Sequence, residues 1–235
     1  MSSKGIEFLL PIKPYLASFN TILTVLLNVA PITKFINISR GKEPYTNIPF
    51  LMLIINIVNN IVWSCYWIKV DEFISFLSSF ISGFFSTTYI LWYNYFASNK
   101  NKCKFVIYIL IQVVCEVVST LFFLSDILKL QVVGLIMIVI TIFQYVAPAQ
   151  NVVKAFKEKN DKLIPIVSTL CGCLSGGGWF FFGLIIMDFN CMIPNGLGFL
   201  SSILTVCAWM YIKNTKKKED DEGEEMGETL NEEEK

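Results

Sequence analysis

The chain has 235 residues, of which 54% are hydrophobic and only 16% are charged, and its mean hydropathy is +0.57. A soluble domain of this length cannot bury so large an apolar excess in one core, because most of its surface is apolar already. The composition therefore argues against a water-soluble enzyme or a nucleic-acid-binding domain. It predicts an integral membrane protein.

Seven apolar runs are long enough to cross a hydrocarbon layer of about 30 Å, which needs about 20 helical residues. In chain order they cover residues 15–33, 47–68, 73–97, 105–124, 130–153, 163–187 and 191–212. Backbone polar groups inside a membrane must bond to one another, so we expect helices rather than strands. The predicted fold class is an all-α membrane protein with seven transmembrane helices.

The basic residues are distributed unequally between the two sides of these spans. Fourteen Lys and Arg residues lie on the connections of one side, and four lie on the other. The excess marks the cytosolic side, so we expect an outward or lumenal N-terminus and a cytosolic C-terminus. Residues 219–235 hold ten acidic residues and one lysine. With so little apolar surface to bury, residues 214–235 are expected to form a disordered acidic tail in the cytosol.

Proline-containing segments recur in the two halves of the chain. Val29–Pro31 near the end of the first span matches Val146–Pro148 near the end of the fifth. Ile48–Pro49 at the start of the second span matches Ile164–Pro165 at the start of the sixth. A proline kinks a membrane helix, so Pro31, Pro49, Pro148 and Pro165 are candidate hinges.

Polar and aromatic residues follow the same register. Trp63 and Trp179 each lie 14 residues after the second proline of their half, and Ser79 and Asn195 each lie 30 residues after it. We infer a first three-helix repeat over residues 1–97, a connecting helix over 98–129, and a second repeat over 130–213. A single connecting helix gives both repeats the same direction through the membrane, which is a 3+1+3 arrangement of parallel repeats.

The residues inside the spans favour a binding site for a neutral polar solute. The amide of Asn195 can both donate and accept hydrogen bonds, which suits a ligand with many hydroxyl groups. The flat face of Trp179 suits the C–H side of a sugar ring. The chain has no histidine, and the repeats contain no paired carboxylates, so coupling to an ion has little support. Glu116 lies in the connecting helix, outside both repeats, and is interpreted as structural or water-facing. No pattern indicates catalysis, a metal or a cofactor.

These segments together resemble the SWEET (MtN3/saliva) family of sugar carriers over nearly all of residues 15–213. The resemblance rests on the proline segments, on Asn47–Phe50, on Gly178–Gly183 and on Ile193–Gly198. The family is the standard example of parallel repeats related by an axis along the membrane normal. The resemblance implies facilitative sugar transport without a driving ion, and assembly into homo-oligomers.

The resemblance also assigns roles to single residues. It implies that the four prolines named above are hinges, that Trp179 and Asn195 contact the sugar, and that Asp188 lies at the outer gate. The first half departs from the family pattern: Ser79 replaces an asparagine, Asn60 replaces a small pocket residue, and Trp63 lies one position later than the family's tryptophan. Asn60 favours a monosaccharide and Ser79 favours a disaccharide, so the identity of the sugar is left undecided. The choice between the plasma membrane and an internal membrane is also left undecided.

Two other functions are alternatives for a chain with seven spans. PQ-loop carriers of amino acids share the repeat, but here Pro31 is followed by Ile32 and Pro148 by Ala149 rather than by glutamine. A seven-span receptor would need neither the internal repeat nor the matching prolines.

Overall fold

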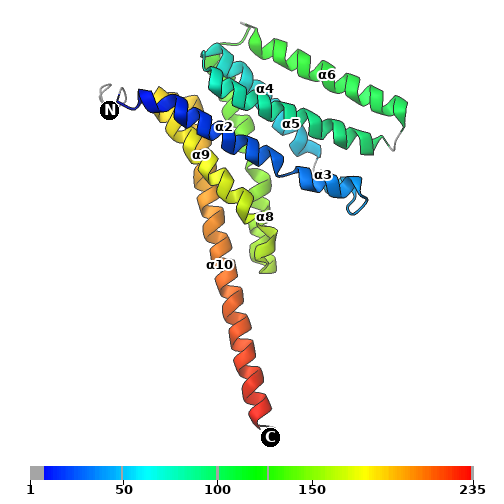
Figure 1. Ribbon diagram of the computed structural model, residues 1–235, viewed down its shortest axis with the longest axis vertical. Coiled ribbons are helices and arrows are strands. Elements are labelled where there is room, and N and C mark those ends of the chain that lie inside the picture. The colour runs from blue at the N-terminus through cyan, green and yellow to red at the C-terminus, as the bar shows by residue number, and fades with distance from the viewer. Residues whose placement is uncertain (1–7, 49, 99–100, 126, 234–235) are drawn as a thin grey trace.

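The computed structural model describes residues 8–48, 50–98, 101–125 and 127–233, and within these residues it contains only helices (Figure 1). The elements in chain order are η1 (Leu10–Ile12), α2 (Lys13–Val29), α3 (Ile32–Ser39), η2 (Tyr45–Asn47), α4 (Phe50–Lys69), α5 (Phe73–Ala97), α6 (Lys102–Leu124), α7 (Leu130–Gln144), α8 (Val146–Glu158), η3 (Asp161–Leu163), α9 (Ile166–Ile186) and α10 (Phe189–Glu233).

Seven of the described segments account for the membrane crossings. Six are helices long and apolar enough to cross a membrane by length and composition, and the seventh is the shorter apolar helix α7. The last span takes only Phe189–Thr215 of α10. The predicted fold class, seven transmembrane helices arranged as 3+1+3, is thereby confirmed.

The helices form two three-helix units joined by α6. The first unit contains α2, α4 and α5, and the second contains α7, α9 and α10. The units meet where α2 packs on α9 and where α4 packs on α7. Each of these two contacts joins the first helix of one unit to the second helix of the other, so the two contacts are equivalent under the repeat.

The repeat extends to the backbone angles of the tight turns. Asp71 between α4 and α5 has φ 58°, and Met187 between α9 and α10 has φ 56°. The two residues are 116 positions apart, the same offset that separates Trp63 from Trp179. A left-handed conformation is uncommon outside glycine, so its occurrence at both positions shows that the two turns have the same geometry.

The proline segments coincide with helix boundaries. Pro31 lies between α2 and α3, and Pro165 immediately precedes α9. The backbone between α7 and α8 bends at Tyr145, because Pro148 has no N–H to donate to the carbonyl four residues earlier. Pro49 lies outside the described residues. The fifth predicted span is therefore two helices rather than one.

The connecting helix α6 lies at the edge of the bundle beside α4 and α5 (Figure 1). A polar network attaches it to α5. Thr87 donates to one Glu116 oxygen over 3.2 Å, and Gln112 donates to the other over 2.8 Å. Asn94 in turn donates to Gln112 over 3.3 Å. This network supports the structural interpretation of Glu116, since both of its carboxylate oxygens accept hydrogen bonds within the protein.

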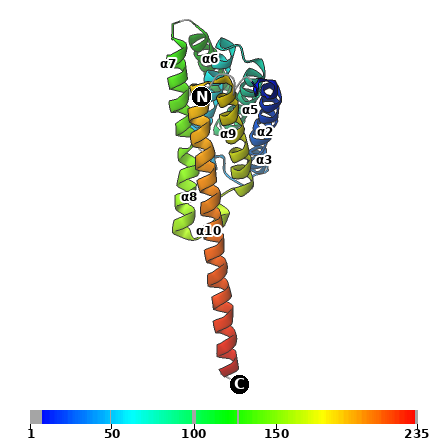
Figure 2. The same ribbon diagram turned by 90° about the vertical axis from the view of Figure 1, so that its left-hand side faces the viewer.

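Helix α10 continues to Glu233 and extends away from the bundle in both views (Figures 1 and 2). This differs from the disordered tail expected for residues 214–235. The sequence offers a reason: this segment is rich in Lys and Glu, which both have high helix propensity.

Candidate functional site

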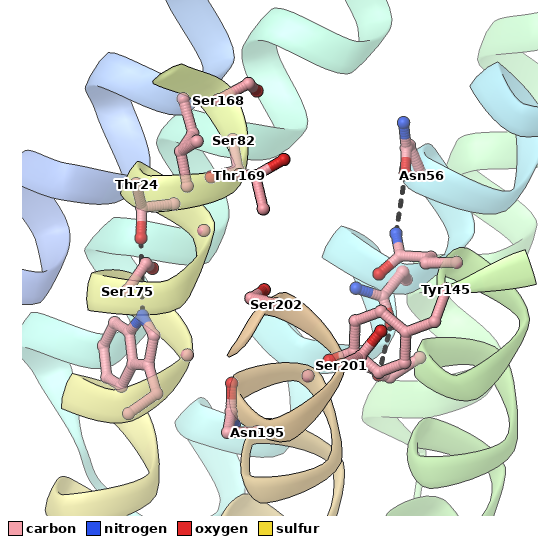
Figure 3. Close-up of a pocket in the computed structure, with 18 of the residues that line it drawn as sticks. Thr24, Asn56, Ser82, Tyr145, Ser168, Thr169, Ser175, Asn195, Ser201 and Ser202 are labelled. Carbon is pink, nitrogen blue, oxygen red and sulfur yellow. Dashed lines mark hydrogen bonds between the residues drawn. The ribbon is translucent and has the colours of Figure 1, made fainter. Parts of the chain in front are cut away.

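A cavity of about 540 Å³ lies between the two units (Figure 3). Its walls come from α2, α4 and α5 of the first unit and from α7 to α10 of the second. None of the described residues that line it is charged. The lining combines indole rings with amide and hydroxyl groups, so it can receive an uncharged solute that has both apolar and polar faces.

Three stacked indole rings form one end of the cavity. The rings of Trp63 and Trp67 have centroids 5.2 Å apart, and those of Trp67 and Trp179 are 6.2 Å apart; both pairs are inclined by 28°. The edge of Phe182 packs against Trp67 and Trp179. Since Trp67 is only 2% exposed, this end is filled by protein.

Beyond the indole rings, a hydrogen-bonded group joins the two units. Tyr66 on α4 donates its hydroxyl proton to Asp188 over 2.8 Å. The side-chain amide of Asn190 donates to the Tyr66 oxygen over 3.1 Å, and its backbone N–H donates to Asp188 over 2.9 Å. Asp188 and Asn190 belong to the turn into α10, so these bonds connect α4 directly to the second unit.

The opposite end of the cavity lies at the level of the prolines. There the lining is rich in hydroxyl groups, from Ser168 and Thr169 on α9 and from Ser202 and Thr205 on α10 (Figure 3). Ser168 and Pro165 are exposed. The cavity is therefore closed at the indole end and accessible at the proline end.

The four predicted contact residues all line this cavity, although they present different groups to it. The side-chain nitrogen of Asn195 donates to the Cys191 carbonyl over 2.8 Å, which leaves its oxygen directed toward the cavity (Figure 3). Asn60 donates to the Asn56 carbonyl and to Ser86, so its N–H groups are already engaged within the first unit. The Ser79 hydroxyl is 3.4 Å from the Ser75 carbonyl. Trp179 forms part of the indole end.

A cluster of amides on α4 meets α7 at the cavity wall. Gln144 donates to the Asn56 side chain over 2.7 Å, and the hydroxyl of Thr141 lies 3.0 Å from the Asn59 side-chain oxygen. Neither Thr141 nor Gln144 was predicted as a site residue from the sequence. Their partners lie more than 80 positions away in the chain, so no local pattern could identify them.

Trp63 on α4 and Trp179 on α9 each donate the indole N–H to a threonine of the other unit. The bond from Trp63 to Thr141 measures 3.4 Å, and the bond from Trp179 to Thr24 measures 3.3 Å. Trp63, displaced by one position from the family pattern, thus lies in the cavity wall together with Trp179. A sequence signal for the threonines did exist: Thr24 lies seven residues before Pro31, and Thr141 lies seven residues before the matching Pro148.

Glycine permits the closest approach between helices beside the cavity. A Cβ atom at Gly198 would overlap the hydroxyl of Tyr145, which donates to the Pro194 carbonyl over 2.9 Å. A Cβ atom at Gly178 would likewise overlap the side chain of Asn20, which is fully buried. These glycines bring α7 against α10 and α2 against α9.

The model of the MtN3/saliva family, described as sugar efflux transporters for intercellular exchange, matches residues 14–101 and again residues 131–218. The chain belongs to this family. The two matches cover the two three-helix units and leave out α6, as the 3+1+3 arrangement requires.

Members of the MtN3/saliva family similar to this chain include two proteins of Arabidopsis thaliana. The bidirectional sugar transporter SWEET10 is 28% identical over 199 residues, which cover 82% of this chain and 68% of the relative. The bidirectional sugar transporter SWEET4 is 27% identical over 219 residues, which cover 89% of this chain and 85% of the relative. The solved structure of a eukaryotic SWEET transporter superimposes with a TM-score of 0.73 at 22% identity, covering 86% of this chain and 98% of that one. This likeness establishes the fold.

Proposed function

We propose that this protein is a facilitative carrier that moves a mono- or disaccharide across a membrane by alternating access. The observation that carries the proposal is the cavity of about 540 Å³ between two like-oriented units, which has indole rings at one end and no charged residue among its described lining. Sugars combine apolar C–H faces with many hydroxyl groups, and this lining matches both. The names of the curated relatives, which are bidirectional sugar transporters, support the same substrate class.

The site residues divide into two proposed roles. Trp179 and Asn195 contact the sugar, with Asn60 and Ser79 on the facing wall. Pro31, Pro49, Pro148 and Pro165 act as hinges at the accessible end, and Asp188 acts with Tyr66 as the gate at the closed end. The described positions of these residues support the roles, because the proline segments bound helices at one end and the Tyr66–Asp188 bond joins the units at the other.

The distribution of basic residues supports an orientation in which the proline end faces the cytosol. In that orientation the N-terminus is outside or lumenal, and the cavity is open to the cytosol and closed to the outside. The protein would then be held in its inward-facing state. Assembly into a homo-oligomer, and residence in the plasma membrane or an internal membrane, are further expectations from the family resemblance.

The proposal is tested by measuring the flux of radiolabelled glucose and sucrose into vesicles that contain the purified protein. We expect flux of at least one sugar down its gradient, in both directions and without an imposed ion gradient. Flux of amino acids with no flux of any sugar in a wider panel would instead support the carrier of the PQ-loop type. The absence of all flux, with ligand-dependent signalling, would support a receptor.

A further inference from the structure

The two bonds between threonine and tryptophan have the same internal design. The Thr24 hydroxyl lies 2.8 Å from the carbonyl of Asn20, and the Thr141 hydroxyl lies 2.8 Å from the carbonyl of Met137. The Thr24 hydroxyl donates its proton one turn back along its own helix, so its oxygen is left to accept the indole N–H. The Thr141 proton has two acceptors, the Met137 carbonyl and the Asn59 side-chain oxygen at 3.0 Å, and with either of them the Thr141 oxygen can still accept the indole N–H. Each threonine is thereby held as an oriented acceptor.

The two bonds are also equivalent under the repeat. Thr24 and Thr141 are 117 positions apart, and Trp63 and Trp179 are 116 positions apart. One bond crosses from α9 to α2, and the other crosses from α4 to α7. These are the two interfaces along which the units meet. A pairing that recurs at both interfaces, while neighbouring positions differ, indicates a requirement of the site rather than incidental packing.

We propose that Thr24 and Thr141 are positioning residues, which hold the indoles of Trp179 and Trp63 by hydrogen bonds across the unit boundary and so fix the orientation of the ring faces that line the sugar cavity. The inference rests on the proposed sugar transport. The bonds engage each indole N–H, so the ring presents its face rather than its N–H to a solute. A sugar stacking on that face depends on the angle of the ring.

The two threonines contribute unequally. Trp63 is 8% exposed and is packed between Tyr66 and Trp67, so neighbouring rings also hold it. The Tyr66 ring meets it edge-on, with ring centroids 6.2 Å apart and an interplanar angle of 83°. Trp179 is half-buried, and its own helix carries glycine at positions 176 to 178. Trp67 and Phe182 also pack against the Trp179 ring, but Trp179 is less buried than Trp63, so its ring depends more on the bond to Thr24.

Transport kinetics test the inference with isosteric variants. Thr24→Val keeps the side-chain shape but removes the acceptor, and we expect it to raise the KM for sugar about tenfold while changing the maximal rate much less. We expect Thr141→Val to raise KM by about threefold or less, because packing retains Trp63. Thr24→Ser restores the acceptor and should restore KM.

Thr21→Val is the matched control on the same helix. The Thr21 hydroxyl donates only to the Ala17 carbonyl, at 2.8 Å, and Thr21 is absent from the cavity wall. Its KM should equal that of the parent protein. A rise in KM with Thr21→Val equal to that with Thr24→Val, or no rise with Thr24→Val, would overturn the inference.

A second readout is independent of transport. In protein labelled with 5-fluorotryptophan, the fluorine resonance that disappears in Trp179→Phe is that of Trp179, and it should shift in Thr24→Val but not in Thr24→Ser or Thr21→Val. In a Trp179→Phe background, Thr24→Val should add no further change in KM, because the N–H donor is already gone. If the parent protein moves no sugar, the proposed function fails, but the fluorine resonance still tests whether Thr24 positions the Trp179 ring. An unshifted resonance in Thr24→Val would refute the positioning whatever the flux.

Discussion

At the scale of single residues, the cavity separates groups that are already bonded from groups that remain available. The amide nitrogens of Asn60 and Gln144 are used within the protein, as are the indole N–H groups of Trp63 and Trp179. The side-chain oxygen of Asn195, by contrast, accepts no hydrogen bond from the described residues and is directed toward the cavity (Figure 3). Among the predicted contact residues, Asn195 is therefore the acceptor best placed for a sugar hydroxyl.

We expect Asn195→Ala to abolish sugar flux while the protein stays folded. The change removes the free acceptor and, with it, a bond to the Cys191 carbonyl that lies within one helix, so the fold loses little. Flux in vesicles measures the first effect, and thermal unfolding monitored by size-exclusion chromatography measures the second. Thr88→Ala, an exposed residue that donates only to its own helix, is the control. Near-normal transport by Asn195→Ala would remove Asn195 from the site.

A second prediction concerns the closed end. Tyr66→Phe removes the hydroxyl that donates to Asp188 and accepts from Asn190. A hydrogen bond to a charged group contributes about 1.5–3 kcal/mol, so its loss should raise the outward-open population at least about tenfold. Cys191 follows Asn190 directly, is fully buried, and has its sulfur 3.3 Å from the Trp179 carbonyl. In a variant with Cys191 as its single cysteine, an impermeant thiol reagent added outside should react correspondingly faster with Tyr66→Phe. An unchanged rate would show that the Tyr66–Asp188 bond does not hold the gate.

At the scale of helices and turns, the two equivalent left-handed residues have a cost in stability. Met187 has φ 56° and is 51% exposed, so its side chain contributes little packing to offset the strain. We expect Met187→Gly to stabilise the fold by up to about 1 kcal/mol, because glycine adopts this conformation without strain. The measurement is the melting temperature, which should rise by about 2–4 °C for a chain of this size. Met187→Ala keeps the strain and should not raise it; equal melting temperatures for the two variants would contradict the explanation.

Sequence reasoning was most accurate at this scale, since the membrane and the repeat constrain helices directly. The span lengths follow from the thickness of the lipid, and two of the prolines predicted as hinges, Pro31 and Pro165, lie at helix boundaries. A kink at Pro148 was predicted, but the span over residues 130–153 was expected to be one helix, whereas it divides at Tyr145, three residues before that proline. Residue contacts were harder: the bonds of Thr24, Thr141 and Gln144 depend on which helices meet across the units. The orientation of Asn60 toward Ser86 likewise depends on how α5 packs against α4.

At the scale of the whole molecule, the charge distribution bears on the energetics of transport. The described cavity lining is uncharged, and Glu116 lies outside it, between α5 and α6. We therefore expect sugar flux to be unaffected by a proton gradient, and Glu116→Gln to leave that independence unchanged. The measurement is initial flux into vesicles with equal or different internal and external pH. Marked stimulation by acid outside would contradict uniport.

The reciprocal bonds between indole and threonine have a consequence for the origin of the chain. In a symmetric dimer of one ancestral three-helix protein, a single threonine and a single tryptophan would form both bonds at once, because each subunit supplies the donor of one and the acceptor of the other. Fusion of duplicated copies would then free the two halves to diverge separately. Asn20 lies against Gly178 on one side, whereas the corresponding positions on the other side are Met137 and Val62, both fully buried in one core cluster, which is the difference expected of such divergence around a retained pair.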